Sequence, residues 1–371
     1  MKTIVVGAGI SGLSTAWALT KRGHDVTLIE QGPIPNPLAA SGDHHRIIRR
    51  AYGAHLGYAA QIDEAFSAWN ALWQDLGQKH YDHRGCLCLS YEKGDAADVH
   101  REGLADGGHP FEIVEAGEAV ARWPFIEERG LRYALYSDEG GALHCRRIAT
   151  GIAEWLRANG ADVRENTKVV GVDVDGATLT LADGSLLAAD SLVVTAGGWV
   201  LNLFPDLAVD LQPYRTAVAY LDPPADLREA WAAAPTLLDV GTEDEGYIIP
   251  PSGDGGLKFG TGLHRQVTAD ADGDREMAPE EGDRIVRHFA PSIARLDEYR
   301  IASTASCVYT FTHDETFYSA HIGHALVVSA CSGHGYKFGA AIGRRVADAV
   351  ETGDLATLRH WMRADQANET A

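Results

Sequence analysis

The sequence of 371 residues is short of basic side chains, because 32 lysines and arginines stand against 52 aspartates and glutamates. The resulting formal net charge of −20 disfavours binding to nucleic acid and to anionic membranes, which carry negative charge themselves. The ordinary consequence of such a surface is solubility. An anionic substrate would therefore need a local basic pocket within an acidic protein.

Long apolar runs and cysteine are also scarce. No segment reaches the roughly 18 uninterrupted apolar residues of a membrane-spanning helix. The early apolar stretch, Lys2–Val6, is typical of a buried strand rather than of a secretion signal. We expect a cytoplasmic protein without a metal site, because the cysteines are odd in number and lack disulfide or zinc spacing. They are Cys86, Cys88, Cys145, Cys307 and Cys331.

A dinucleotide-binding pattern follows this first strand. It consists of Gly7-Ala8-Gly9-Ile10-Ser11-Gly12, a helical run, and a second strand that ends before Glu30. Gly7 makes the tight turn, Gly9 lets a pyrophosphate approach the backbone, and Gly12 lets helix and strand pack. Glu30 is placed to accept hydrogen bonds from a ribose. The pattern predicts a bound dinucleotide but does not separate FAD from NAD.

The middle of the chain predicts further helices and strands, and the length suggests two domains. Helical periodicity over Tyr58–Leu76 places Trp69 and Trp73 on one face, which is more typical of a core than of a cofactor site. The apolar strand 190–194 runs into a Gly-Gly turn at Thr195–Trp199. That turn is either a structural strand end or a second backbone segment against the cofactor.

Two motifs near the C-terminus carry the strongest chemical signal. Ser306–Thr310 presents a thiol and a phenol two residues apart, hence on one face of a strand. Ser332–Lys337 holds two glycines, where a backbone must come close to something, and then a lysine. A redox ring held by the cysteine and a carboxylate held by the lysine would explain both motifs.

These motifs, in this order, resemble the monomeric sarcosine oxidase group of the D-amino-acid oxidase superfamily of flavoproteins. Segments 41–53, 211–215 and 256–260 add to the resemblance, which spans nearly the whole chain. It implies an α/β fold, with a discontinuous, glutathione-reductase-like Rossmann-type FAD-binding domain and an inserted mixed β-sheet substrate domain. The expected boundaries are 1–85, 145–215 and 300–371 for the first domain and 86–144 and 216–299 for the second.

The resemblance also assigns roles in the chemistry. Cys307 matches the cysteine that carries FAD as a thioether. Arg49 and Lys337 match the pair that clamps the substrate carboxylate, a task that suits the planar fork of arginine. Lys258 matches the lysine that activates oxygen, because a fixed positive charge stabilises a superoxide-like anion. Arg46 belongs to the arginine-bearing segment near the flavin.

Two further residues match the substrate pocket less closely. Tyr247 and Tyr309 match tyrosines that line it. Sarcosine oxidases of the group keep an active-site histidine four residues after the oxygen-activating lysine, whereas this chain has Gly262 there and His264 two residues later. A glycine at this position would open space for a larger amine. We expect His264 to contact the substrate.

Each assignment has a structural alternative. Cys307 could be an ordinary buried cysteine, Lys258 a solvent-facing strand residue, and Arg49 half of a surface ion pair. The tyrosines could serve packing alone, and His44 and His45 could contact either substrate or flavin. The expected FAD contacts, drawn from all of these motifs, are Gly7, Gly9, Ile10, Ser11, Gly12, Glu30, Gln31, His45, Arg46, Val169, Ala196, Gly197, Trp199, Cys307, Gly333, Gly335, Tyr336 and Lys337.

The expected activity is FAD-dependent oxidation of the CH–NH bond of a carboxylate-bearing amine, such as an N-methyl, secondary or cyclic amino acid. Hydride passes to FAD, the imine hydrolyses, and O₂ regenerates FAD with release of H₂O₂. Two alternatives stay open: a dehydrogenase that uses a quinone or carrier protein, and a flavoprotein subunit of a larger complex. The expected partners are the small amine and O₂, for a monomer or homodimer. The sequence does not name the amine.

Overall fold

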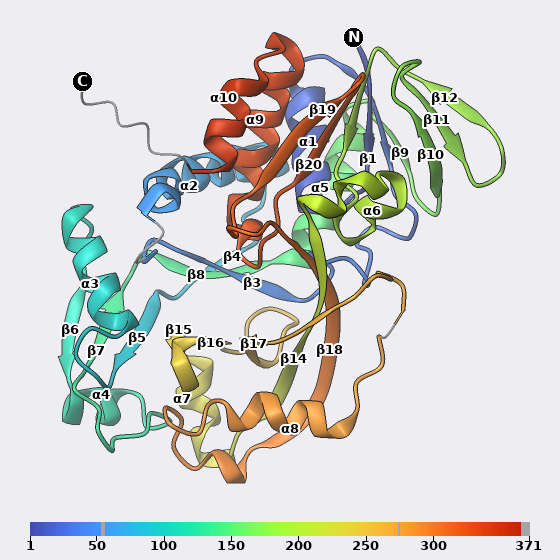
Figure 1. The fold of residues 1–371 in the computed structure, drawn as a ribbon. Helices are drawn as coiled ribbons and strands as arrows, with labels where there is room; N and C mark the ends of the chain where they lie inside the picture. Colours follow the sequence, from blue (N-terminus) through green and yellow to red (C-terminus); the bar gives the residue numbers. More distant parts are fainter. Residues whose placement is uncertain (53–55, 274, 365–371) are drawn as a thin grey trace.

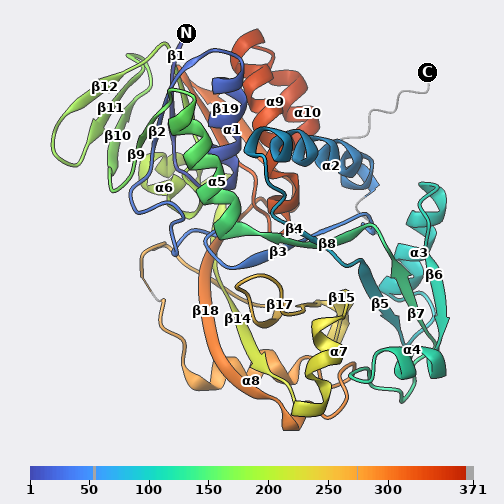
Figure 2. The same cartoon turned by 180° about the vertical axis from the view of Figure 1, so that it is seen from behind.

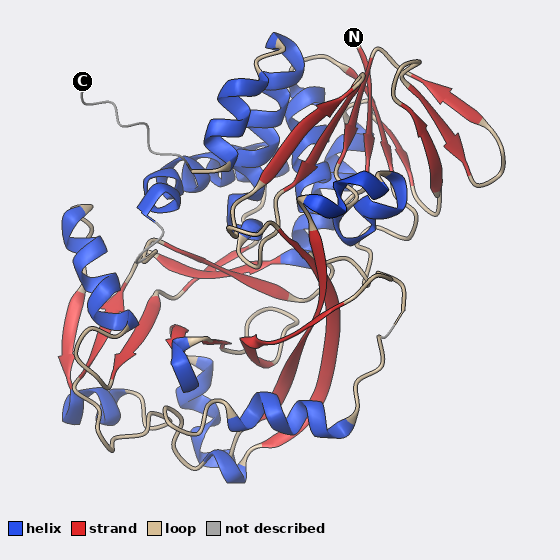
Figure 3. Ribbon diagram, viewed as in Figure 1, coloured by secondary structure: helices blue, strands red, loops and turns tan. Residues whose placement is uncertain are grey.

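A six-stranded sheet forms the centre of the upper half of the molecule in Figures 1 and 3. The computed structural model describes residues 1–52, 56–273 and 275–364. Neighbouring strands of this sheet are parallel, except for an antiparallel pair at one edge. In spatial order they are β19 (Tyr318–Ile322), β20 (Ala325–Ser329), β13 (Ser191–Val194), β1 (Lys2–Val6), β2 (Asp25–Ile29) and β9 (Asp162–Arg164).

The two faces of this sheet have different covers, because successive side chains of a strand point to opposite sides. Val5 and Val193 pack under helices, whereas Ile4 and Val194 pack against a smaller sheet. The helices are α1 (Ile10–Lys21), α2 (Leu56–Leu76), α5 (Cys145–Ala158), α9 (Gly339–Thr352) and α10 (Leu355–Met362). The other cover consists of β10 (Val169–Asp173), β11 (Thr178–Leu181), β12 (Leu186–Ala188) and α6 (Val200–Leu203).

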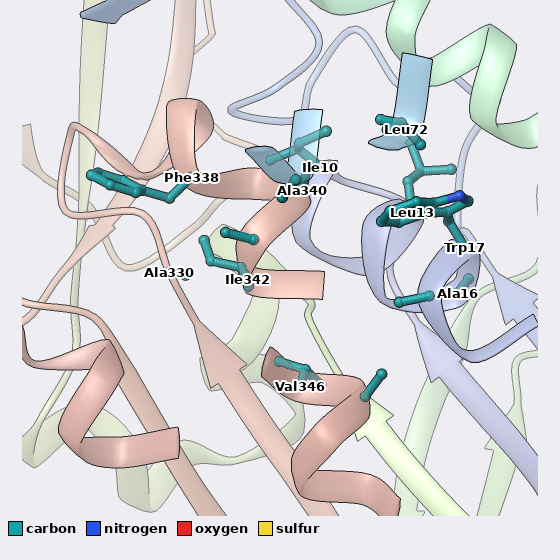
Figure 4. Close-up of a cluster of buried hydrophobic side chains, with 14 of the residues drawn as sticks. Ile10, Leu13, Ala16, Trp17, Leu72, Ala330, Phe338, Ala340, Ile342 and Val346 are labelled. Carbon is teal, nitrogen blue, oxygen red and sulfur yellow. The ribbon is translucent and has the colours of Figure 1, made fainter. Parts of the chain in front are cut away.

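Helices α1 and α9 pack against each other, and Figure 4 shows apolar side chains of both in one buried cluster. Ile10, Leu13 and Trp17 come from α1, and Ile342 and Val346 come from α9. Burial of such side chains stabilises the fold by roughly 1.5–3 kcal/mol each. The contact therefore fixes the helix that follows the N-terminal glycines against the C-terminal part of the chain.

The second large sheet has eight strands and fills the lower half of the molecule in Figure 1. It is mixed, because β5 and β15 are parallel whereas the other neighbours are antiparallel. Its strands are β18 (Arg300–Phe311), β14 (Gln212–Asp222), β17 (Leu257–Val267), β16 (Gly246–Ile249), β15 (Thr236–Val240), β5 (Cys86–Ser90), β7 (Tyr133–Ser137) and β6 (Glu112–Glu115). Helices α3 (Ala96–Asp106), α4 (Ala116–Arg122), α7 (Arg228–Ala232) and α8 (Pro279–Arg287) accompany it.

A three-stranded sheet lies between the two halves, as Figures 1 and 2 show from opposite sides. Its strands are β3 (His45–Arg49), β8 (Gly140–His144) and β4 (Tyr81–His83), all antiparallel. Strand β3 carries the arginine-bearing segment that the sequence singles out. The topology thus places that segment where residues of both large sheets can reach it.

The predicted fold class is confirmed: a parallel nucleotide-binding type of sheet is combined with a mixed sheet. Trp69 and Trp73 stack with ring centroids 5.1 Å apart in the core, as expected of a structural pair. The predicted domain boundaries stay predictions. Strand β18 lies in the eight-stranded sheet, although the boundary at 300 groups it with the first domain. In the part of the chain that the structure describes, no helix is long and apolar enough to cross a membrane.

Candidate FAD and substrate site

A large cavity opens at the carboxyl ends of β1, β2, β13 and β20, where parallel sheets bind their ligands. It encloses about 1200 Å³ including its open mouth. The sequence motifs meet here, although Gly7 and Tyr336 are 329 positions apart in the chain. The predicted site residues that line it are Gly7, Gly9, Ile10, Ser11, Glu30, Gln31, Arg46, Val169, Ala196, Gly197, Trp199, Tyr309, Gly333, Gly335 and Tyr336.

The start of α1 leaves backbone donors for an anion. Gly9 is the N-cap and provides no side-chain hydrogen bond, so the first N–H groups of the helix have no protein cap. Gly7 has a φ of +97°, and a Cβ there would collide with the Thr195 carbonyl. A Cβ at Gly12 would overlap the Gly7 carbonyl. These glycines are therefore required by the close approach of the turn and helix.

Glu30 is buried at the end of β2 and already holds the loop that follows it. Its Oε2 accepts a hydrogen bond from the Ala8 N–H at 2.7 Å, and its Oε1 accepts from Gly32 N–H and the Asn36 amide. Each carboxylate oxygen can accept more than one hydrogen bond. Glu30 therefore fits its predicted contact with a ribose while serving as a scaffold.

Two cysteines lie near this cavity, and they differ in access. Cys307 is 8% exposed, and its Sγ lies 3.3 Å from the Thr216 Oγ1. It does not belong to the described lining of the cavity, whereas Cys331 does and is partly exposed. Tyr309, two residues after Cys307 on β18, does line the cavity. The face of β18 that carries Cys307 and Tyr309 is thus directed towards the cavity.

Lys258 on β17 is completely buried and has a carboxylate partner. Its Nζ donates to the Asp43 Oδ2 at 2.5 Å and to the His45 carbonyl at 3.2 Å. Asp43 also accepts from Arg46 at 2.8 Å and from the Tyr220 hydroxyl at 2.5 Å. Burial alone would raise the pKa of Asp43, but the charges of Lys258 and Arg46 outweigh it and hold that pKa well below its usual value.

His45 lies next to this group and is fully buried. Its Nε2 donates to the Gly256 carbonyl at 3.2 Å, and its Nδ1 has no partner among the described residues. Burial, reinforced by the positive charge of Lys258, lowers the pKa of His45 to about 3. The imidazole is therefore neutral at physiological pH and fills space beside the Tyr220 ring.

Arg49 and Lys337 meet at one aromatic ring. The guanidinium carbon of Arg49 lies 5.2 Å from the Tyr52 ring centroid, and the Lys337 Nζ lies 5.1 Å from the same centroid. Burial lowers the pKa of Lys337 well below its ordinary value, and the neighbouring charge of Arg49 adds to this effect. The sequence-predicted clamp thus comes together from β3 and the segment before α9.

Hydrogen bonds hold Lys337 and Tyr52 in place. Lys337 donates to the His334 carbonyl at 2.9 Å and to the Tyr52 hydroxyl at 3.3 Å. The His334 Nε2 lies 3.0 Å from the Glu315 carbonyl, so this nitrogen is the donor and Nδ1 accepts from the Tyr52 hydroxyl at 2.6 Å. The lysine therefore donates to the phenol oxygen, and the phenol in turn donates to the histidine.

The family follows from the whole chain rather than from one motif. The model of the family described as FAD dependent oxidoreductase matches residues 2–349. The chain belongs to this family. It is therefore an FAD-dependent oxidoreductase, and the family predicted from the motifs is confirmed.

Relatives of this oxidoreductase cover nearly its full length. Monomeric sarcosine oxidase from Bacillus sp. (strain B-0618) is 29% identical over 364 residues, which are 94% of this chain and 92% of the relative. N-methyl-L-tryptophan oxidase from Escherichia coli O157:H7 is 28% identical over 378 residues, or 94% of each chain. The structure of L-proline dehydrogenase from P. horikoshii has a TM-score of 0.81 at 19% identity, covering 98% of this chain and 96% of that one, which shows the fold alone.

The remaining predicted site residues of the oxidoreductase, Tyr247 and His264, lie on neighbouring strands of the eight-stranded sheet. Tyr247 on β16 packs over Gly260, and the Lys258 Nζ lies 5.7 Å from its ring centroid. His264 contacts the Glu281 carboxylate at 3.0 Å instead of any member of the Arg49–Lys337 group. Gly262 does not open space as expected, because the Glu245 carboxylate occupies the position of a Cβ there.

Several residues of the site gave no sequence signal of their own. Asp43 lies inside the arginine-bearing segment, where an acidic residue among basic ones could have indicated an ion pair. Tyr52 lies at the end of the same segment. Asp239 and His100, which contact Arg49, lie in ordinary strand and helix sequences and carry no motif. Only the folded chain brings them to the site.

Proposed function

We propose that this FAD-dependent oxidoreductase is an oxidase of a small amine that bears a carboxylate, namely an N-methyl, secondary or cyclic amino acid. The observation that carries the proposal is the convergence of Arg49 and Lys337 on the Tyr52 ring. Two basic side chains beside one ring, in a protein of net charge −20, offer a carboxylate a local site of positive charge. The relatives named sarcosine oxidase and N-methyl-L-tryptophan oxidase support an N-methyl amino acid as the substrate class.

The cavity residues fit FAD as the bound group. When bound, FAD supplies the two-electron oxidant that takes hydride from the carbon next to nitrogen, gives an imine that hydrolyses, and is regenerated by O₂ with formation of H₂O₂. The α1 start would hold the pyrophosphate and Glu30 a ribose, from the contacts described above. Arg49 and Lys337 orient the substrate, and Tyr247 and Tyr309 border its amine.

Lys258 is proposed to hold a positive charge beside the oxygen-reacting part of the cofactor. Its burial and its pairing with Asp43 keep it in one position, which favours electrostatic stabilisation of an anion. Arg46 lines the cavity and shares the same carboxylate. The Asp43 network therefore connects the cofactor cavity with the lysine.

Covalent attachment of FAD through Cys307 is part of the proposal. Its test is acid precipitation of the purified protein, after which the flavin should stay with the pellet. Cys307→Ala should release the flavin into the supernatant, whereas Cys331→Ala should leave it bound. Release from Cys331→Ala alone would move the attachment to the cysteine that lines the cavity.

The activity is tested with a panel of amines assayed for H₂O₂ and O₂ uptake. We expect peroxide from N-methyl or cyclic amino acids and none from the corresponding amines without carboxylate. Flavin reduction without O₂ uptake would instead identify a dehydrogenase with another acceptor. The same assay applied to each purification fraction would show whether the chain acts alone, as a monomer or homodimer, or needs further subunits.

Arg49→Leu tests the clamp itself. Removal of the guanidinium should raise KM for the best substrate by roughly 100-fold, because a charge-assisted pair is lost. Arg147→Leu removes an arginine that pairs with Asp254 at the surface, and it should leave KM unchanged. An unchanged KM in Arg49→Leu would remove this residue from substrate binding.

A further inference from the structure

The clamp arginine already has a carboxylate partner within the chain. Arg49 Nη1 donates to the Asp239 Oδ2 at 2.9 Å. The same oxygen lies 2.5 Å from the His100 Nε2. Because a carboxylate oxygen only accepts hydrogen bonds, the His100 Nε2 is the donor to Asp239. The Asp239 carboxylate is therefore held beside Arg49 by its own strand, β15, and by a hydrogen bond from His100 of α3.

The backbone of β15 is distorted at the point where Asp239 leaves it. Asp239 has a φ of +50°, a conformation that is uncommon for residues other than glycine. The pairing of β15 with β16 also shifts register between Leu237 and Val240. Such a conformation costs free energy, and it persists where surrounding contacts determine it. Here those contacts are the bonds of the carboxylate to Arg49 and His100.

The ion pair leaves one edge of each partner available. Arg49 contacts Asp239 and His100 through Nη1 alone within the described chain, and the Oδ1 of Asp239 has no hydrogen-bond partner among residues 1–52, 56–273 and 275–364. The side chains of Arg49 and Asp239 are 17% and 29% exposed, so both can be reached. A substrate that binds the free edge of Arg49 would therefore lie beside the Asp239 Oδ1, which is available as an acceptor.

The charges of this group oppose a simple anionic ligand. The second cation of the clamp, Lys337, is bonded to a phenol and a carbonyl rather than to a carboxylate. Arg49 is neutralised by Asp239, and a substrate carboxylate placed on the same guanidinium would lie next to a like charge. Juxtaposed like charges in a binding site cost several kcal/mol, whereas a donor placed between two carboxylates removes this cost.

We propose that Asp239 is a specificity-determining residue, which selects amino acid substrates that carry a hydrogen-bond-donating, cationic group within a few bonds of their carboxylate. The proposal rests on the proposed function, because it takes Arg49 as the anchor of the substrate carboxylate. The substrate carboxylate occupies the free edge of Arg49, and the cationic group donates to the Asp239 Oδ1. The substrate carboxylate and Asp239 then share the guanidinium of Arg49. The proposed substrate class is a secondary amino acid with a short basic side chain.

The test uses two ethers that replace the substrate nitrogen by oxygen and therefore cannot form an imine. They are 2-methoxybutanoate and 4-amino-2-methoxybutanoate, which differ by one ammonium group. Dissociation constants for the FAD-loaded protein are measured by calorimetry and by the change in flavin absorbance. We expect the amino ether to bind roughly 10-fold or more tightly than the plain ether.

Asp239→Asn should abolish this preference. It should also lower the dissociation constant of the plain ether roughly 10-fold, because the anion beside Arg49 is removed. Asparagine is well tolerated at a positive φ, so the backbone can be kept. Asp239→Gly is a second variant that also relieves the backbone. Asp226→Asn removes the same charge from a surface pair with Arg295, and it should retain the wild-type preference.

The outcomes separate the two proposals. If both ethers bind and their affinity ratio is the same in the wild type and the two Asp239 variants, the selectivity role is contradicted and the clamp stands. If neither ether binds, while the protein holds FAD, the carboxylate clamp of the proposed function is contradicted together with the inference. A preference that Asp226→Asn also loses would assign the effect to net charge and overturn the role of Asp239.

Discussion

Lys258 and Lys337 are two buried lysines in one molecule, and they are stabilised in different ways. Lys258 is paired with the Asp43 carboxylate at 2.5 Å within a network that includes Arg46. Lys337 donates to a phenol and a carbonyl, and its pKa is lowered by burial. Burial penalises an ammonium charge unless an opposite charge lies beside it. The first lysine therefore has a counter-charge within the fold, whereas the charge of the second depends on pH and ligand.

This difference suits the two proposed roles. A charge that assists the reaction of O₂ must be present throughout the cycle, and the Asp43 pair provides it. A charge that binds a substrate carboxylate is stabilised when that carboxylate arrives, because the ligand is then its counter-charge. The substrate side would thus acquire its full charge only in the complex.

The largest expected effect comes from breaking the paired side with Asp43→Asn. Two buried cations, Lys258 and Arg46, would lose their counter-charge, and we expect the free energy of unfolding to fall by about 3–5 kcal/mol. Denaturant unfolding measures this change. Asp226→Asn is the matched control, which loses an exposed pair and should change stability little. Equal losses in both variants would contradict the comparison.

Lys258→Met tests the proposed role of the fixed charge. Reoxidation of the reduced enzyme by O₂ should slow by roughly 100-fold, because the charge that stabilises the developing anion is lost. Flavin reduction by the amine should change little, since Lys258 does not belong to the clamp. Stopped-flow measurement of the two half-reactions separates these effects, with Lys258→Arg as the charge-conserving control. Equal slowing of both half-reactions would refute the role.

The pH dependence of stability tests the surroundings of Lys258. The pKa of His45 is about 3 in the folded chain against 6.5 for an ordinary histidine. Between these values the unfolded chain binds more protons, so the stabilisation is complete above pH 6.5 and is lost as pH falls towards 3. By pH 5 the loss should reach about 2 kcal/mol. In His45→Gln, the free energy of unfolding measured with denaturant should lack this part of its pH dependence. An unchanged pH dependence would contradict the assignment to His45.

The smallest effect is expected at the unpaired lysine. As pH rises through the lowered pKa of Lys337, its charge disappears and the affinity for a carboxylate should fall by about 10-fold. Titration with methoxyacetate, the ether analogue of sarcosine, measures this across the pH range in which the protein stays folded. Lys337→Arg keeps its charge and should give a flat profile. Parallel profiles would show that Lys337 does not supply the charge.

Sequence reasoning succeeded where the requirement lies in consecutive residues. The glycines at positions 7 and 12 are required by a tight turn and a close helix contact, which are local demands. It failed at Gly262, where the carboxylate of Glu245, the residue before β16, fills the inferred space. It also could not foresee that His264 would pair with Glu281 of α8. Side chains that meet from different elements of the fold leave no periodic signal.

By itself, the sequence determined the dinucleotide-binding start, the family and the two C-terminal motifs, because strand alternation and glycine geometry act over a few residues. Only the tertiary structure decided which charges are paired. Lys258 meets an aspartate 215 positions away, and Arg49 meets one 190 positions away. Sheet pairing and chain crossing set these contacts, and the charge of each buried cation depends on them. Lys258 therefore has its counter-charge within the fold, whereas Lys337 would obtain one from the bound ligand.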